Sequence, residues 1–156
     1  MKMVEFLRPE LVLEELQATE KTDVLEEIAA FVASRDPSMP PKERLFEGLI
    51  EREKLRSTGI GDHVAIPHGR FAQLPRLTAA FARSRRGIEF IGTDDQPGTF
   101  HHFIVLFAPD DSTGLHLKAL ARITRLFKNP DLRRRLLEAP DADALFRLIA
   151  DEDARY

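Results

Sequence analysis

The sequence lacks cysteine altogether. Disulfide bonds, a zinc site with cysteine ligands and thiol catalysis are therefore excluded. Long apolar runs are also missing, since none approaches the roughly 20 residues that a membrane-spanning helix needs. The first residues, MKMVEFLRPELVLEEL, place charges in every apolar run and so differ from a signal peptide. We expect a cytoplasmic protein that does not insert into a membrane.

An excess of charge of one sign is absent too, because the formal net charge is -3. Bulk charge therefore gives no reason to expect a nucleic-acid partner. Two short basic runs stand out, Arg83–Arg86 and Arg133–Arg135. Neither contains the interleaved aromatic residues that stack on bases. We expect both to be solvated, the first as a polar turn and the second on a helix.

Motifs for nucleotides and metals are missing as well. The sequence has no GxxxxGK[ST] pattern, so a P-loop is excluded. His63 and His68 could be combined with Asp62, Asp110 and Asp111 into a metal site, but neither HExxH nor another metal-ligand spacing supports it. We therefore expect no metal and no other cofactor.

Apolar residues recur at helical spacing in five parts of the chain, and proline-containing pairs separate most of these parts. A proline at position 41 is well placed for the first turn of the second helix. The predicted helices span roughly 22–34, 42–54, 114–128, 130–138 and 141–151.

Strand patterns lie between the second and third predicted helices. The continuous apolar run Phe103–Phe107 is typical of a strand that is covered on both faces. Leu77–Arg83 and Gly87–Phe90 predict two further strands, before a loop over 92–99, and residues 4–16 predict an extended lead-in. No linker divides the 156 residues. We expect an α/β fold in a single domain, with a mixed β-sheet flanked by helices on both faces.

The stretch Arg52–Arg70, REKLRSTGIGDHVAIPHGR, is poor material for a regular helix or a central strand. It delivers His68 between Pro67 and Gly69. A neutral imidazole is a nucleophile, and a phosphoryl group carried on it would need donors for its oxygens. Backbone amides of glycines, hydroxyls and an arginine can supply them. In this stretch they are Gly59, Gly61, Gly69, Ser57, Thr58 and Arg52.

Composition and spacing alone favour a simpler interpretation, in which the glycines form turns at strand ends and His68 is a surface histidine. His116 stands at the start of a predicted helix, where it could donate to an anion, orient His68 or be merely exposed. His101 and His102 would point to opposite faces of a strand, and we expect them at a solvated strand entrance.

The run R-E-x-x-x-S-T-G-I-G-x-x-V-A-I-P-H, from Arg52 to His68, closely resembles the signature of enzyme IIA domains of the fructose/mannitol type in the bacterial phosphotransferase system. ARSRRGIEF, FIVLFAP and LHLKALARI then match in the right order. The resemblance covers residues 4–149. A free-standing domain looks most like the nitrogen-regulatory branch, in which enzyme IIA serves signalling.

The resemblance implies a role for each matching residue. His68 would be the phosphorylated histidine, His116 the second histidine beside the phosphate, and Arg52 the arginine that ends the preceding helix. Ser57 and Thr58 would lie at the pocket rim with Gly59, Gly61 and Gly69. Docking of a partner requires an apolar rim, for which we expect Ile60, Ile66 and Phe71. The family commonly has a small residue where His63 stands.

The implied activity is that of a phosphoryl carrier rather than a free-standing metabolic enzyme. A phosphorylated HPr-type carrier would be the donor, and an enzyme IIB or a regulatory protein would receive the signal or the phosphoryl group. Two alternatives stay open. One is an interaction module that binds regulatory targets whatever its phosphorylation state. The other is a metal-dependent hydrolase that uses the histidines.

Overall fold

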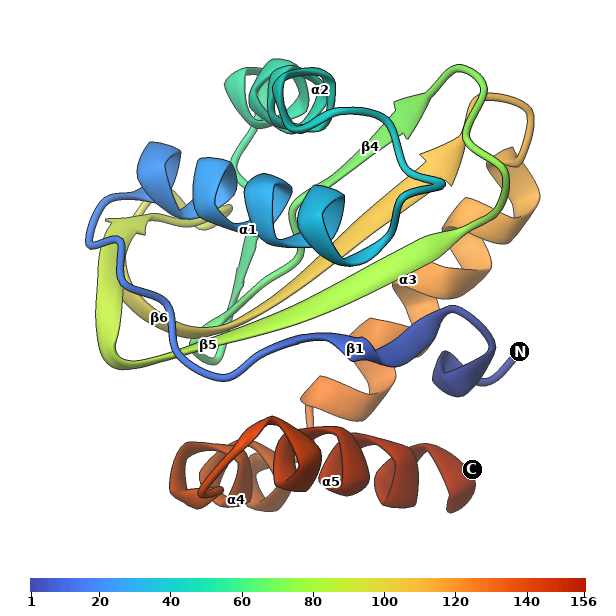
Figure 1. Ribbon diagram of the computed structural model, residues 1–156. Helices are drawn as coiled ribbons and strands as arrows, with labels where there is room; N and C mark the ends of the chain where they lie inside the picture. Colours follow the sequence, from blue (N-terminus) through green and yellow to red (C-terminus); the bar gives the residue numbers. More distant parts are fainter.

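The computed structural model describes residues 1–156. Five α-helices and six strands form one domain, with the sheet between two helical layers (Figure 1). None of the helices has the length and the apolar content that crossing a membrane requires. In chain order the elements are a 3-10 turn η1 (Met3–Glu5), β1 (Leu7–Leu13), α1 (Lys21–Arg35), α2 (Lys42–Leu55), β2 (Gly59–Gly61), β3 (Val64–Ala65), β4 (His68–Phe71), β5 (Thr78–Ile91), β6 (Pro97–Pro109), α3 (Thr113–Phe127), α4 (Pro130–Glu138) and α5 (Ala142–Ala154).

The five helices lie where the sequence predicts them, to within a few residues at each end. Local chemistry explains these boundaries. Asn129 caps α4 by accepting a hydrogen bond from the backbone N–H of Asp131, and Pro130 fills the first helical position. Asp141 caps α5 in the same way through the N–H of Ala144.

The sheet is mixed, which confirms the predicted fold class. Its strand order is β1-β5-β6-β3-β2, and β4 pairs with β6 further along the same side as β3. The long pair β5 and β6 is antiparallel, as is the short pair β2 and β3, whereas β1 runs parallel to β5, and β3 and β4 run parallel to β6. The run Phe103–Phe107 is fully buried in β6, as expected for a strand covered on both faces. β4 has no further neighbour, so it is an edge strand.

Two hydrophobic cores lie on opposite faces of this sheet. One joins α1 and α2 to the sheet through residues such as Ile28, Leu49 and Phe107. The other joins α3, α4 and α5 through residues such as Ile123 and Phe81. Figure 1 shows α1 and α2 on one side of the strands and α4 and α5 on the other.

The predicted turn over Arg83–Arg86 is wrong. β5 runs unbroken from Thr78 to Ile91 and takes up the polar residues as an irregularity between Arg83 and Ile88. Gly87 lies there with a φ of 91°, a conformation that only glycine adopts easily. β6 is also longer than predicted, so the end of the expected 92–99 loop belongs to the strand.

Arg83 is fully buried, which corrects the expectation of a solvated basic run. Its Nε donates to the carbonyl of Glu14 at 3.1 Å, and its Nη1 donates to the carbonyls of Leu136 at 2.8 Å and Ala139 at 2.7 Å. These bonds, with the carboxylate of Glu15 at 3.5 Å from Nε, offset part of the loss of water around the guanidinium, whose Nη2 is buried without a partner. Arg83 therefore anchors the C-terminal end of α4 to the sheet. Arg85 and Arg86 are exposed, as expected.

His102 is the cross-strand neighbour of Arg83 and is only 1% exposed. The expectation of a solvated strand entrance is therefore wrong for His102, whereas His101 is half-buried and bonds through Nδ1 to the carbonyl of Ser84. Burial lowers the pKa of His102 to about 3, and nearby positive charges add to this effect. The imidazole of His102 is therefore neutral in the folded protein.

Candidate functional site

His68 is the first residue of the edge strand β4, and it shares a pocket with residues of α2 and α3. The preceding Pro67 has no N–H to donate, but its carbonyl accepts a hydrogen bond from the N–H of Leu106 on β6 at 2.9 Å. His68 itself is opposite Leu106 in the parallel ladder. The Pro-His-Gly sequence therefore places His68 where a strand begins and where one side of the strand faces solvent.

Two glycines let α2 lie directly on β4. A Cβ atom on Gly48 of α2 would come within 2.3 Å of Cε1 of Phe71, and a Cβ atom on Gly69 would lie 3.3 Å from the carbonyl oxygen of Gly48. Both positions leave little room for a side chain. This close approach brings the last turn of α2, with Arg52, beside His68.

The hydrogen bonding of His68 determines which of its nitrogens can react. Nδ1 lies 2.7 Å from the carbonyl oxygen of Ile66. A carbonyl can only accept, so Nδ1 carries the proton and donates it, and Nε2 keeps its lone pair. Burial lowers the pKa of His68, and the charge of Arg52 lowers it further against the opposing effects of the Ile66 carbonyl and Glu53. His68 is thus a neutral imidazole with a nucleophilic Nε2 at physiological pH.

His116 lies close to His68, although 47 residues separate them in the sequence. The ring centroids are 5.2 Å apart, and the rings are nearly perpendicular, at 77°. His116 is 7% exposed, and its Nε2 is buried without a hydrogen-bond partner in the protein. Burial lowers its pKa to about 4, with further lowering by His68, Arg70 and Arg52. The unpaired ring nitrogen of this neutral imidazole can therefore form a hydrogen bond with a group that binds at His68.

One pocket contains His68, His116, Arg52 and Gly69, so the structure brings four of the predicted site residues together. Arg52 is half-buried, and its Nη1 donates to the carbonyl of Arg56 at 2.8 Å, which fixes the side chain at the end of α2. The complete lining is Gly48, Glu51, Arg52, Leu55, His68, Gly69, Arg70, His116, Leu117 and Leu120.

The apolar rim of this pocket consists of leucines that the sequence analysis missed. Leu55 is 81% exposed and Leu117 is 63% exposed. The prediction of Ile66 and Phe71 as rim residues is wrong, because both are buried, and Ile60 on β2 does not line the pocket. Leu117 lies out of phase with the buried stripe of α3, and this offset was the available signal.

The other predicted site residues organise the return from α2 to the sheet and do not line the pocket. The hydroxyl of Thr58 donates to Oε1 of Glu53 at 2.6 Å, and its N–H donates to Oε2 at 2.9 Å. The hydroxyl of Ser57 accepts from the N–H of Gly59 at 3.1 Å. A phosphate contact of Ser57, Thr58, Gly59 and Gly61 stays a prediction.

Glu53 is a structural residue that the sequence analysis missed. Besides holding Thr58, its carboxylate is paired with Lys21 of α1 at 2.5 Å, and its side chain is 7% exposed. The pair therefore ties α1, α2 and the loop before β2 together. A glutamate directly after Arg52 in the matching run was the available signal.

The remaining histidines lie outside the pocket. His63 adopts a φ of 66°, a left-handed conformation in which a small residue would be less strained, and its Nδ1 lies 2.8 Å from the carbonyl of Thr99. No three histidine, aspartate or glutamate side chains gather in a way that would hold a metal ion.

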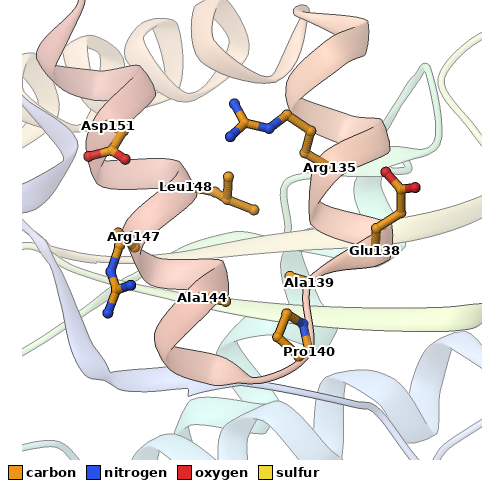
Figure 2. A pocket seen from close by; sticks show the side chains of 8 residues that line it. All are labelled: Arg135, Glu138, Ala139, Pro140, Ala144, Arg147, Leu148 and Asp151. Carbon is orange, nitrogen blue, oxygen red and sulfur yellow. The ribbon is translucent and has the colours of Figure 1, made fainter.

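A second hollow lies between α4 and α5 (Figure 2). Arg135 and Glu138 reach it from α4, and Leu148 and Asp151 come from α5. It contains no histidine, and its charged side chains are two arginines and two carboxylates, so neither sign of charge dominates.

The predicted solvated basic run over Arg133–Arg135 is confirmed in part. Arg134 and Arg135 are exposed as expected, whereas Arg133 is half-buried.

Comparison with known proteins agrees with this architecture. The chain matches, over residues 5–152, the family described as phosphoenolpyruvate-dependent sugar phosphotransferase system, EIIA 2. It is 37% identical over 150 residues to a nitrogen regulatory protein from Bradyrhizobium diazoefficiens, which covers 96% of this chain and 95% of that protein. It is 31% identical over 153 residues to the fructose-specific EIIABC component of Bacillus subtilis, covering 98% of this chain and 24% of that longer protein.

A solved structure, the nitrogen regulatory protein IIA-Ntr from Neisseria meningitidis, superimposes with a TM-score of 0.83 at 30% identity. The match covers 94% of this chain and 98% of that one. The chain therefore belongs to the type 2 enzyme IIA family of the phosphoenolpyruvate-dependent phosphotransferase system.

Proposed function

We propose that this protein is a phosphoryl carrier and that Nε2 of His68 accepts the phosphoryl group from the phosphohistidine of an HPr-type carrier protein. The observation that carries this proposal is the hydrogen bond from Nδ1 of His68 to the carbonyl of Ile66. It leaves Nε2 as the unprotonated nitrogen, inside a pocket that also contains an arginine and a second histidine.

The transfer needs no prior loss of a proton from His68. The lone pair of Nε2 attacks phosphorus in line with the donor nitrogen, the new N–P bond forms as the donor N–P bond breaks, and the donor imidazole keeps the electron pair of the broken bond. Nδ1 retains its proton, so the ring of phosphorylated His68 becomes formally cationic. The carbonyl of Ile66 stabilises that ring through the bond that it already makes.

Arg52 and His116 would stabilise the charge on the phosphoryl oxygens. Arg52 is a permanent cation, and its side chain is fixed at the pocket by the carbonyl of Arg56. His116 is neutral and can donate one N–H to a phosphoryl oxygen without repelling the incoming donor histidine. The exposed Leu55 and Leu117 would pack against the carrier and exclude water from the transfer.

The nitrogen regulatory relatives favour a regulatory role for the phosphorylated state, in which a charge added at one surface patch changes what the protein binds. Onward transfer to an enzyme IIB is the second use that the family suggests, because the fructose-specific relative joins this domain to further components in one chain.

Phosphorus NMR and intact mass spectrometry after mixing with a phosphorylated HPr-type carrier test the proposal. We expect one acid-labile phosphoryl group on the wild-type protein and none on His68→Ala. His101→Ala removes a histidine outside the pocket and should be phosphorylated normally. Circular dichroism should show that both variants are folded. Phosphorylation of folded His68→Ala, or no transfer to the wild-type protein from any such carrier, would contradict the proposal.

A further inference from the structure

We infer that Arg70 is a second cation that contacts the phosphoryl group during its transfer to His68, together with Arg52. This inference rests on the proposed phosphoryl-carrier function. Arg70 is not among the predicted site residues, because it follows the glycine that ends the Pro-His-Gly motif.

The geometry of β4 places Arg70 on the reactive side of the strand. Side chains two residues apart on a strand point to the same face. Gly69 and Phe71 pack toward α2, as their contacts with Gly48 show. Arg70 therefore shares the face of His68, is exposed, and lines the same pocket as His68 and His116.

The charge of Arg70 already acts inside the pocket. It is among the groups that lower the pKa of His116, after burial and His68 and before Arg52. A cation that repels a proton from His116 attracts a phosphoryl group between His68 and His116 for the same reason.

Arg70 has no partner within the protein that would compete with a phosphate. Its guanidinium makes no side-chain hydrogen bond and no ion pair, whereas Arg52 donates to the carbonyl of Arg56. The one carboxylate that lines the pocket, Glu51, is 3.6 Å from Lys54. The N–H donors of Arg70 are therefore available, and their planar fork fits two oxygens of one phosphoryl group.

Two arginines from different elements would then flank the reacting nitrogen, Arg52 from α2 and Arg70 from β4. A phosphoryl group carries close to two negative charges, which one arginine neutralises only in part. A residue that contacts the phosphoryl group changes the rate of transfer, whereas a residue that contacts only the carrier surface changes its affinity.

The test compares Arg70→Gln, Arg70→Lys and the control Arg86→Gln, which removes the same charge from an exposed site at the irregularity of β5, outside the pocket. Rates of phosphorylation by the HPr-type carrier give kcat and KM, and a phosphorus NMR pH titration of the phosphorylated proteins gives the pKa of the phosphoryl group itself. Arg70 and Arg86 are both exposed, so we expect all three variants to fold.

We expect Arg70→Gln to lower kcat about 10-fold to 100-fold and to raise the pKa of the phosphoryl group, because a cation in contact favours the dianion. Arg70→Lys should restore part of both effects, and Arg86→Gln should match the wild type. An unchanged kcat and an unchanged phosphorus titration in Arg70→Gln would overturn this inference alone. Failure of the wild-type protein to accept a phosphoryl group would overturn it together with the proposed function.

Discussion

The ring of Phe71 lies so close to Gly48 that a Cβ atom at position 48 would come within 2.3 Å of its Cε1. At this point α2 contributes no side chain to its contact with β4, and its last turn places Arg52 at the pocket of His68. Glycine inside a helix is about 1 kcal/mol less favourable than alanine. The contact with Phe71 explains why the helix keeps this residue.

Gly48→Ala should lower the stability of the protein. The gain in helix propensity is about 1 kcal/mol, whereas overpacking a filled site costs about 1–3 kcal/mol. Phe71 cannot easily move away, since it is buried and its ring packs against Phe107 at 5.7 Å between centroids. We expect a net loss of about 1 kcal/mol in urea unfolding, and slower phosphorylation of His68. Glu47→Ala, on the exposed face of α2, is the control, and a Gly48→Ala protein more stable than the wild type would refute this account.

Replacing His116 should separate binding from transfer. His116→Ala leaves the leucines of the rim in place, so the carrier should bind with nearly unchanged affinity in an NMR titration. The loss of one donor to the phosphoryl oxygens should slow transfer about 100-fold in rapid-quench measurements. A rate equal to that of the wild type would mean that His116 does not meet the phosphoryl group.

Acid should destabilise the protein through His102. Its pKa is about 3 in the folded state and near 6.5 in an unfolded chain, so between these values only the unfolded state binds the proton. Stability is therefore greatest above pH 6.5 and falls as the pH drops toward 3. At about pH 4.5, two units below 6.5, this residue alone accounts for a loss of about 3 kcal/mol.

Urea unfolding at pH 7 and at about pH 4.5 measures this loss, with His102→Leu as the comparison. The leucine variant removes the titrating group and keeps an apolar contact for Phe81, which stacks on His102 at 6.3 Å. Its stability should change less between the two pH values than that of the wild type. An equal change in both proteins would assign the acid sensitivity to other groups.

Arg83→Met should be strongly destabilising. The methionine fills much of the space but removes the hydrogen bonds from the guanidinium to the carbonyls of Glu14, Leu136 and Ala139. The carbonyl of Ala139 keeps a donor in Arg85, and that of Leu136 keeps the N–H of Ala139. We expect a loss of about 2–4 kcal/mol in the free energy of unfolding. Hydrogen exchange should show the largest loss of protection in α4. Arg86→Met, at an exposed position of the same strand, should stay within about 0.5 kcal/mol of the wild type.

The sequence predicts those elements whose signals are local. α4 spans the predicted residues because its asparagine cap and its proline adjoin each other, and the core of β6 is one uninterrupted apolar run. The sequence wrongly predicts two strands in place of β5, because a buried arginine looks like a turn residue in the sequence. The carbonyls that accept hydrogen bonds from Arg83 belong to Leu136 and Ala139, which lie 53 and 56 residues away. No local sequence pattern predicts contacts at that separation.

The site shows the same limit. The chemistry of single residues left His68 as either a nucleophile or a surface histidine, and only the resemblance to a family suggested His116 as its neighbour. The choice of Nε2 depends on a carbonyl two residues before His68, and the apolar rim depends on which leucines the packing of α2 and α3 leaves outside. Both are properties of the folded chain.

The two histidines of the site are held by the two different cores that lie on opposite faces of the sheet. His68 is carried by the strand that α2 covers, through Gly48 and Phe71, whereas His116 is carried by α3, which belongs to the other core through Ala119. The distance of 5.2 Å between their ring centroids therefore depends on how the α1/α2 layer and the α3/α4/α5 layer are placed relative to each other. A substitution in the interior of either layer can therefore change the separation of the two rings without contacting them. A phosphoryl group held between the two rings would in turn link the two layers.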